Sequence, residues 1–194
     1  YSSHTIDIAI RYQQLMYSGN NYDYQTGWLQ ETTINNIPEV FVQESGFTIP
    51  KETPFLLEGN AEDINENDQL TYSWEQNDAS DITFSPPDYP PNTGPLFCSV
   101  DATSKGNIRY FPHIESLLEN NYFTENIEQL PFASREMNMR LLVRDNNLIS
   151  GGFNYKNVQF FVNENAGPFR VTSQSEEEIW EIGSEYNITW DVAN

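Results

Sequence analysis

Residues 59–74 read GNAEDINENDQLTYSW and join a strand pattern to a dense run of oxygen-bearing side chains. In the second half, Leu70, Tyr72 and Trp74 alternate with polar residues, which predicts a half-buried β-strand. In the first half, four residues whose side-chain oxygens suit hard cations fall within six positions: Asp63, Asn65, Asn67 and Asp68. Three readings are open for this stretch: a calcium site, part of a catalytic centre, or a polar turn between two strands.

The same period-two alternation recurs at residues 137–146, 157–165 and 186–192, with turn-forming residues between the runs. In each run the apolar residues are expected to face a partner sheet and the polar residues to face water. Repeated strands without intervening helices favour a mainly β fold. We predict an antiparallel, immunoglobulin-like β-sandwich.

Helix is scarce in the chain. Residues 4–17 are one candidate, and residues 111–121 are another because Pro112 suits a first helical turn. The second candidate lies inside a long Pro- and Asn-rich connection, about residues 77–133. We therefore expect a short helix within a long inter-strand connection, a kind of segment that often carries function.

The chain is expected to be a piece of a longer protein. Residues 1–37 are predicted to form a helix and linker. Residues 38–166 are predicted to form the β-sandwich. Residues 167–194 hold two strand patterns, too few for a sandwich, so we expect them to begin a second β-domain.

The charge balance restricts the partners. The chain has 29 acidic and 9 basic residues, a formal net charge of -20. A surface this negative repels phosphate backbones and anionic lipids, so neither nucleic acid nor membrane is an expected partner. No apolar run approaches the roughly 18 residues of a membrane-spanning helix, so no membrane insertion is expected. Divalent cations are the natural counterions.

The motifs of common hydrolases are missing. The only histidines are His4 and His113, and neither belongs to an HExxH motif, so the chain lacks a credible zinc-ligand set. No GxSxG nucleophile motif is present. Paired carboxylates could still converge from anywhere, which leaves an independent hydrolase as a weak alternative. An EF-hand is excluded, because that loop would require Gly and Glu where Asp68 and Trp74 stand.

A calcium site formed by sandwich loops remains open. Loops at one end of a sandwich meet in space, so residues 61–68 could approach the Arg-Asp-Asn-Asn run at 144–147 or the Asn-rich run at 162–167. The alternative is that these side chains only build Asx-turns between strands. The candidate calcium ligands are Asp63, Asn65, Asp68 and Asp145.

Several stretches resemble known modules. Residues 48–76, TIPKETPFLLEGNAEDINENDQLTYSWEQ, resemble the opening of cadherin-like and PKD-like sandwich modules of secreted bacterial proteins. With NIRYFP at 107–112, the helix pattern HIESLL and LVRDNN at 142–147, the chain resembles the module that follows the catalytic domain of secreted bacterial reprolysin-like zinc metalloproteases. Residues 167–194 are similar to the start of the next β-domain in such proteins, and YSSHTIDIAIRY at 1–12 resembles the final helix of the protease domain that precedes the module, so residues 1–37 would include the end of that domain.

This resemblance implies a non-catalytic accessory region that spaces or stabilises a catalytic domain or binds substrate. Zinc would belong to a catalytic domain outside this chain, and calcium is the candidate cofactor here. The implied partners are adjacent domains of the same chain and a protein or polysaccharide substrate, in a secreted or bacterial cell-surface location. The alternative is a calcium-dependent adhesion or glycan-binding module, with sugar-stacking candidates Tyr22, Tyr24, Trp28 and Tyr89.

Overall fold

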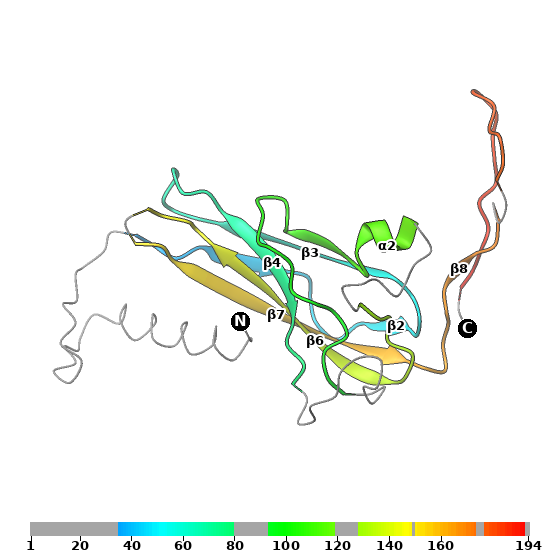
Figure 1. The fold of residues 1–194 in the computed structure, drawn as a ribbon, viewed down its shortest axis with the longest axis horizontal. Coiled ribbons are helices and arrows are strands. Elements are labelled where there is room, and N and C mark those ends of the chain that lie inside the picture. The colour runs from blue at the N-terminus through cyan, green and yellow to red at the C-terminus, as the bar shows by residue number, and fades with distance from the viewer. Residues whose placement is uncertain (1–34, 80–92, 119–127, 149, 174–176, 193–194) are drawn as a thin grey trace.

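The structure, a computed structural model, describes residues 35–79, 93–118, 128–148, 150–173 and 177–192 (Figure 1). The helix predicted at residues 4–17 and the four sugar-stacking candidates lie outside these residues. Among the described residues, no helix is long and apolar enough to cross a membrane.

Two sheets form the body of the protein (Figure 1). The first has the order β1 (Glu39–Val42), β3 (Phe55–Glu62), β5 (Ile108–Phe111), with antiparallel neighbours. The second has the order β2 (Thr48–Pro50), β7 (Phe153–Asn163), β6 (Arg135–Arg144), β4 (Thr71–Gln76). Helix α2 (Ile114–Leu118) lies between β5 and β6 in the chain. The prediction of a mainly β protein is confirmed.

The second sheet is mixed, so the prediction of a wholly antiparallel fold is wrong at one strand. Strand β2 runs parallel to β7, with Ile49 opposite Val162. Between β1 and β2 the chain leaves the first sheet for the second at Gly46, which has a φ of 95° and donates its N–H to the Gln159 carbonyl at 2.7 Å. Glycine takes this left-handed conformation without a Cβ penalty, which permits the change of sheet.

Strand β5 lies inside the segment predicted to be an irregular connection, residues 77–133. Its inward residues are Arg109 and Phe111, and its outward residues are Ile108 and Tyr110. The pattern places one charged residue inside beside Phe111 and two apolar residues outside, which departs from the usual alternation. For this reason hydrophobic periodicity did not identify the strand.

One hydrophobic cluster joins the two sheets. Trp74 and Leu141 of the second sheet and Leu57 of the first have no exposed surface. Gly59 allows this close packing, because a Cβ there would lie 2.3 Å from the Leu141 Cδ2. The other buried members from both sheets are Val40, Ala61, Tyr72, Phe111, Met137, Met139, Val143, Val158, Phe160 and Val162. The predicted inward faces of residues 70–76, 137–146 and 157–165 are thus confirmed.

The outward face of β6 differs from the expected solvated surface. Arg140 is 3% exposed and Leu142 is 1% exposed. The Arg140 guanidinium lies 4.1 Å from the centroid of the Tyr155 ring on β7, and its Nε donates to the Asn157 Oδ1 at 3.0 Å. A long side chain on a central strand can therefore be covered by its neighbours on the adjoining strand, which a period-two pattern does not anticipate.

The third sheet is a short hairpin, β8 (Arg170–Val171) paired with β9 (Trp190–Asp191), which Figure 1 shows beside the end of the sandwich. The strand predicted at 186–192 is mostly irregular, and the inward face expected for it is exposed at Tyr186, Ile188, Trp190 and Val192. The physical reason is that no described sheet covers this hairpin, so its apolar residues lack a partner surface.

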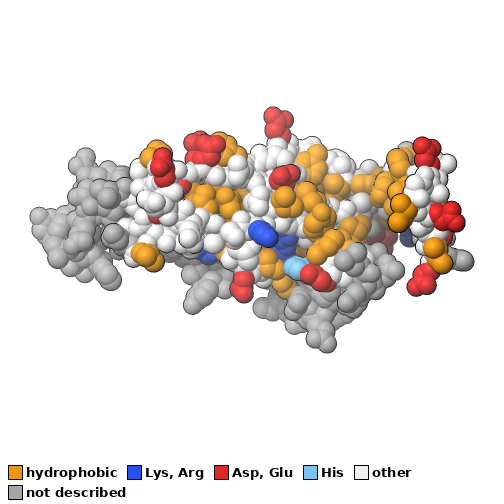
Figure 2. Space-filling view, turned by 90° about the horizontal axis from the view of Figure 1, so that it is seen from above, with side chains coloured by type: hydrophobic (Ala, Val, Ile, Leu, Met, Phe, Trp, Pro, Cys, Tyr) orange, Lys and Arg blue, Asp and Glu red, His pale blue; other side chains and the backbone are white. Residues whose placement is uncertain are grey.

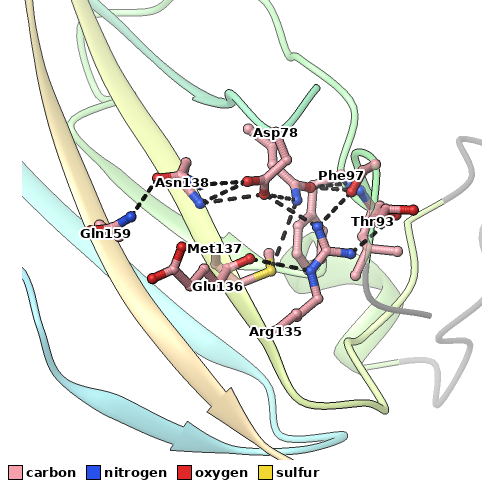
Figure 3. A network of polar contacts seen from close by, with 11 residues as sticks. Asp78, Thr93, Phe97, Arg135, Glu136, Met137, Asn138 and Gln159 are labelled. Carbon is pink, nitrogen blue, oxygen red and sulfur yellow. Dashed lines mark hydrogen bonds and ion pairs between the residues drawn. The ribbon is translucent and has the colours of Figure 1, made fainter. Parts of the chain in front are cut away.

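A buried polar network holds the segment after β4 against β6 (Figure 3). The Asp78 carboxylate accepts the Asn138 Nδ2 at 2.7 Å and the Gln76 Nε2 at 2.6 Å. It also lies 3.4 Å from the Arg135 Nη2. These contacts attach Asp78, two residues beyond β4, to β6.

The same network also secures the chain where it returns at residues 93–97. The Arg135 Nη2 donates to the Gly94 carbonyl at 2.7 Å, and the Gln76 Oε1 accepts the N–H groups of Leu96 and Phe97 at 2.6 and 3.0 Å (Figure 3). The segment directly after β4 and the segment at residues 93–97 are thus both bonded to the second sheet.

The packing of the core predicts that substitution of two leucines by alanine lowers the free energy of unfolding to different extents. Leu141→Ala should lower the free energy of unfolding by about 2–5 kcal/mol, because it removes a fully buried side chain between the sheets. Leu56→Ala is the matched control, since Leu56 is 39% exposed, and it should change stability by about 0.5 kcal/mol or less. Urea unfolding measures both, and equal losses would contradict the packing described here.

Candidate metal centre

Three carboxylates converge where two connections meet. Asp63 and Asp68 lie between β3 and β4, and Asp145 directly follows β6. One oxygen of each carboxylate lies within 4.8 Å of the others. Figure 1 shows the two connections at the same end of the sandwich, away from the β8–β9 hairpin. The loop lies between two strands, in accord with the exclusion of an EF-hand.

Asp63 has one bonded oxygen and one that lacks a partner. Its Oδ1 accepts the Asn65 N–H at 2.8 Å, which forms an Asx-turn. Its Oδ2 is buried and has no hydrogen-bond partner. Burial raises the pKa of the Asp63 carboxyl, the Asn65 N–H opposes that rise, and the charges of Asp68 and Asp145 add to it. This carboxylate is therefore held in an environment that disfavours its charge.

Asp145 is fully buried and is oriented by three N–H donors. Its Oδ1 accepts the N–H of Gly152 at 2.7 Å and the N–H of Asn147 at 3.1 Å. Its Oδ2 accepts the Asn35 Nδ2 at 2.6 Å. Donors from three parts of the chain thus fix both oxygens, and the bond from Asn147 is a second Asx-turn.

Two asparagines bond the connections to each other. The Asn147 Nδ2 donates to both oxygens of Asp68, at 2.9 and 3.2 Å. The Asn146 Nδ2 donates to the Gln69 carbonyl at 2.6 Å and to the Thr71 Oγ1 at 2.9 Å. Asn146 has a φ of 53°, a left-handed conformation that asparagine tolerates better than most residues. The three carboxylates therefore lie on two loops that are already joined by hydrogen bonds.

The fourth predicted ligand, Asn65, has a different set of contacts. Its Oδ1 accepts the Asn36 N–H at 2.9 Å, and its backbone N–H orients Asp63. These bonds connect the β3–β4 loop to the segment before β1. The role of Asn65 as a metal ligand stays a prediction. The alternative of simple Asx-turns also holds in part, because Asp63 and Asp145 form such turns and still converge.

The donor set suits a hard cation. Calcium accepts six to eight oxygen ligands in flexible geometry, and carboxylates supply one or two each. The ion pairs found among the described residues are Arg109–Glu128, His113–Glu115 and Arg135–Asp78, and none includes a carboxylate of the cluster. Three negative groups without a neutralising side chain repel one another, and a divalent ion would reverse that repulsion.

The sequence did not indicate that Asn35, Asn147 and Gly152 donate to the carboxylates, or that Asn36 and Asn146 fasten the β3–β4 loop to its neighbours. The paired asparagines at 35–36 and 146–147 and the Gly-Gly step at 151–152 were visible as turn signals. Nothing in a turn signal indicates which distant loop it contacts, and Asn35 lies 110 positions from Asp145.

A pair of adjacent glycines tests this arrangement. A Cβ at Gly152 would lie 2.6 Å from the Asp145 Oδ2, so Gly152→Ala should displace that carboxylate and cost about 1–3 kcal/mol. A Cβ at Gly151 would meet nothing closer than 3.5 Å, so Gly151→Ala is the matched control and should be neutral or slightly stabilising. Urea unfolding compares the two, and similar effects would refute the placement of Asp145 against Gly152.

Models of known protein families, curated proteins and solved structures were all compared with this chain, and none matches it. The chemistry of the site therefore has to be argued from its own residues.

Proposed function

We propose that the described region is a non-catalytic, immunoglobulin-like β-sandwich module whose loops are joined by calcium. The observation that carries the proposal is the convergence of Asp63, Asp68 and Asp145, with the Asp63 Oδ2 buried and lacking a hydrogen-bond partner. A buried anionic oxygen without a donor is costly, and a bound cation would satisfy it.

The strand order supports the immunoglobulin-like part of the proposal. The order β1-β3-β5 facing β7-β6-β4 corresponds to strands A-B-E facing G-F-C of that fold. In this scheme the β3–β4 and β6–β7 connections are the B–C and F–G loops, which lie together at one end of such sandwiches. The candidate ligands come from these two connections.

Calcium would contribute charge neutralisation and a cross-link between distant parts of the chain. Asp63 and Asp68 lie about 80 positions from Asp145, so an ion bound to all three would tie the two sheets together at their shared end. An end stiffened in this way would keep a fixed orientation to whatever domain adjoins it. That property suits a spacer, and together with the resemblance to modules of secreted metalloproteases it leads us to propose an accessory role in such a protein.

A calcium titration tests the cation site. For a dissociation constant of about 0.1 mM, in the range of extracellular calcium modules, 10 mM calcium should add about 2.7 kcal/mol to the free energy of unfolding. For a chain of this size that corresponds to a rise in the thermal midpoint of roughly 5–10 °C. Magnesium should give less, because it requires near-octahedral geometry and keeps its water. An unchanged midpoint in millimolar calcium would sink the proposal.

Relative to the unsubstituted protein, Asp63→Asn should have different effects on the thermal midpoint in EDTA and in calcium. In EDTA, Asp63→Asn should leave the midpoint unchanged or raise it, because it removes one of three mutually repelling charges. In calcium, the same variant should lose most of the increment, because a ligand oxygen and a negative charge are gone. Glu66→Gln is the matched control, an exposed carboxylate of the same loop that should keep the full increment. Equal responses of the two variants would contradict the assignment.

The accessory role needs a separate test on the full-length protein. Deletion of residues 38–166 should lower the thermal stability of the adjoining catalytic domain or its cleavage of protein substrates. If cleavage and stability are both unchanged, the accessory role is wrong even where calcium binds.

A further inference from the structure

The first sheet ends at β5, and the outer edge of this strand carries backbone groups without partners. In the antiparallel pair of β3 and β5, the Gly59 N–H donates to the Asn107 carbonyl at 2.9 Å. Hydrogen-bonded and non-hydrogen-bonded pairs alternate along such a ladder, so Ile108 and Tyr110 direct their N–H and C=O groups away from β3. Among the described residues, no hydrogen bond to these edge groups is found.

The neighbouring edge of the second sheet, at β4, is closed. The Tyr72 N–H donates to the Thr103 carbonyl at 2.9 Å, and the Thr103 N–H donates to the Tyr72 carbonyl at 3.1 Å. Further along β4, the Trp74 carbonyl accepts the Arg109 Nη1 at 2.6 Å. Native proteins usually cover or block strand edges, because an open edge pairs readily with another chain. Of these two neighbouring edges, β5 is therefore the one left open.

A groove follows the open edge of β5. Its volume is about 360 Å³, and it is bounded by β5, by residues 100–106 and by the start of α2. Ile108 and Tyr110 line it and are each 43% exposed, and Ile114 is 36% exposed. Figure 2 shows this face, where hydrophobic side chains lie beside Lys, Arg and His side chains. A ligand therefore has access to the edge and to apolar surface beside it.

The unpaired backbone groups indicate an extended polypeptide as the ligand. A β-strand offers N–H and C=O groups that match those of a strand edge, and β-strand addition uses these main-chain bonds for affinity and alternate side chains for specificity. A ligand residue bonded to Ile108 or Tyr110 would direct its side chain to the same face as theirs. Leu56, which lies opposite Tyr110 in the register, is 39% exposed on that face. Every second residue of the ligand should therefore be apolar.

The charges near the edge favour a ligand with basic residues. Glu58 lies opposite Ile108 in the register and is exposed, and no ion pair found among the described residues includes Glu58. Lys105 and Asp101 of the groove lining offset each other. A second copy of this chain would bring together two molecules of formal net charge -20, which repel each other. A different polypeptide, apolar at its centre and basic at its ends, suits the edge better.

We propose that the open edge of β5 binds an extended segment of another protein by β-strand addition. The apolar side chains of that segment would contact Ile108, Tyr110 and Leu56, and a basic residue would lie near Glu58. The bound segment would become the fourth strand of the first sheet. This edge shares no residue with the Asp63–Asp68–Asp145 cluster, so the inference does not depend on calcium binding.

Three peptides test the proposal in a ¹⁵N–¹H titration of the whole chain. The parent peptide is acetyl-Lys-Val-Thr-Val-Thr-Val-Lys-amide, which alternates two good strand formers, and it should shift the amide signals of Ile108 and Tyr110. N-methylation of its valines removes the donors on the β5 side and should weaken binding about 10-fold or more. N-methylation of its threonines is the matched control, because those N–H groups face away from β5, and it should change the affinity less than about 2-fold.

Variants of the protein complete the experiment. Tyr110→Pro removes an edge N–H that β3 does not use, and proline is tolerated where the N–H of an edge strand faces solvent. It should weaken binding about 10-fold, whereas Tyr110→Val keeps the N–H and an apolar side chain and should bind within about 3-fold of the unsubstituted protein. Glu58→Gln should weaken binding of the parent peptide about 2- to 5-fold and leave a peptide with glutamines in place of its lysines unaffected. Thermal melts check that each variant is folded.

Any of four results would overturn the proposal. The first two are equal binding of the two N-methylated peptides and equal binding by the two Tyr110 variants. The third is no shift at about 2 mM parent peptide, which would leave only affinities weaker than the millimolar range. The fourth is a dimer in sedimentation equilibrium that Tyr110→Pro dissociates, since that result would assign the edge to a second copy of this chain.

Discussion

Two-sided burial of β6 (Arg135–Arg144) is the constraint on which the rest of the structure depends. Strand β6 pairs with β7 along its whole length and with β4 from Met139 to Arg144. Its inward side chains have no exposed surface and fill the space between the sheets. At its beginning Arg135 contacts Asp78 and donates to the Gly94 carbonyl, and directly after its end Asp145 belongs to the acidic cluster. The core, the connection and the candidate metal centre are therefore all positioned by one strand.

The buried and partly buried charges divide into satisfied and unsatisfied groups. Arg109 meets Glu128 at 2.6 Å, and Arg135 reaches Asp78, so these two buried cations each have an anionic partner. Desolvation lowers the pKa of both arginines, and the carboxylates of Glu128 and Asp78 oppose that shift. The Asp63–Asp68–Asp145 cluster holds charges of one sign only. In the proposed function, a bound cation takes the part for this cluster that Glu128 and Asp78 take for the two arginines.

Particular residues explain how far sequence reasoning reached. Tyr72, Trp74, Met137 and Val158 were placed in the core correctly, because period-two alternation directly reports which side of a strand is buried. Strand β5 was missed because its inward residue is Arg109, whose charge is satisfied by Glu128, 19 positions away. The burial of Arg140 was missed because it depends on Tyr155 of the next strand. The three carboxylates named from the sequence do converge, and their role as ligands stays a prediction, whereas the bonds from Asn35 and Asn147 that hold them were not anticipated.

By itself, the sequence determined the local properties: the strands with regular alternation, the absence of an EF-hand spacing, the excess of negative charge and the acidic loop at residues 62–68. Each of these depends on neighbours a few positions apart, which sterics and solvation act on directly. The tertiary structure alone decided that β2 joins the second sheet in parallel, that Arg109 lies inward against Glu128, and that Asn35 fixes the Asp145 carboxylate. These depend on the packing of segments tens of residues apart, and a chain pattern carries no information on which distant groups will share a buried space.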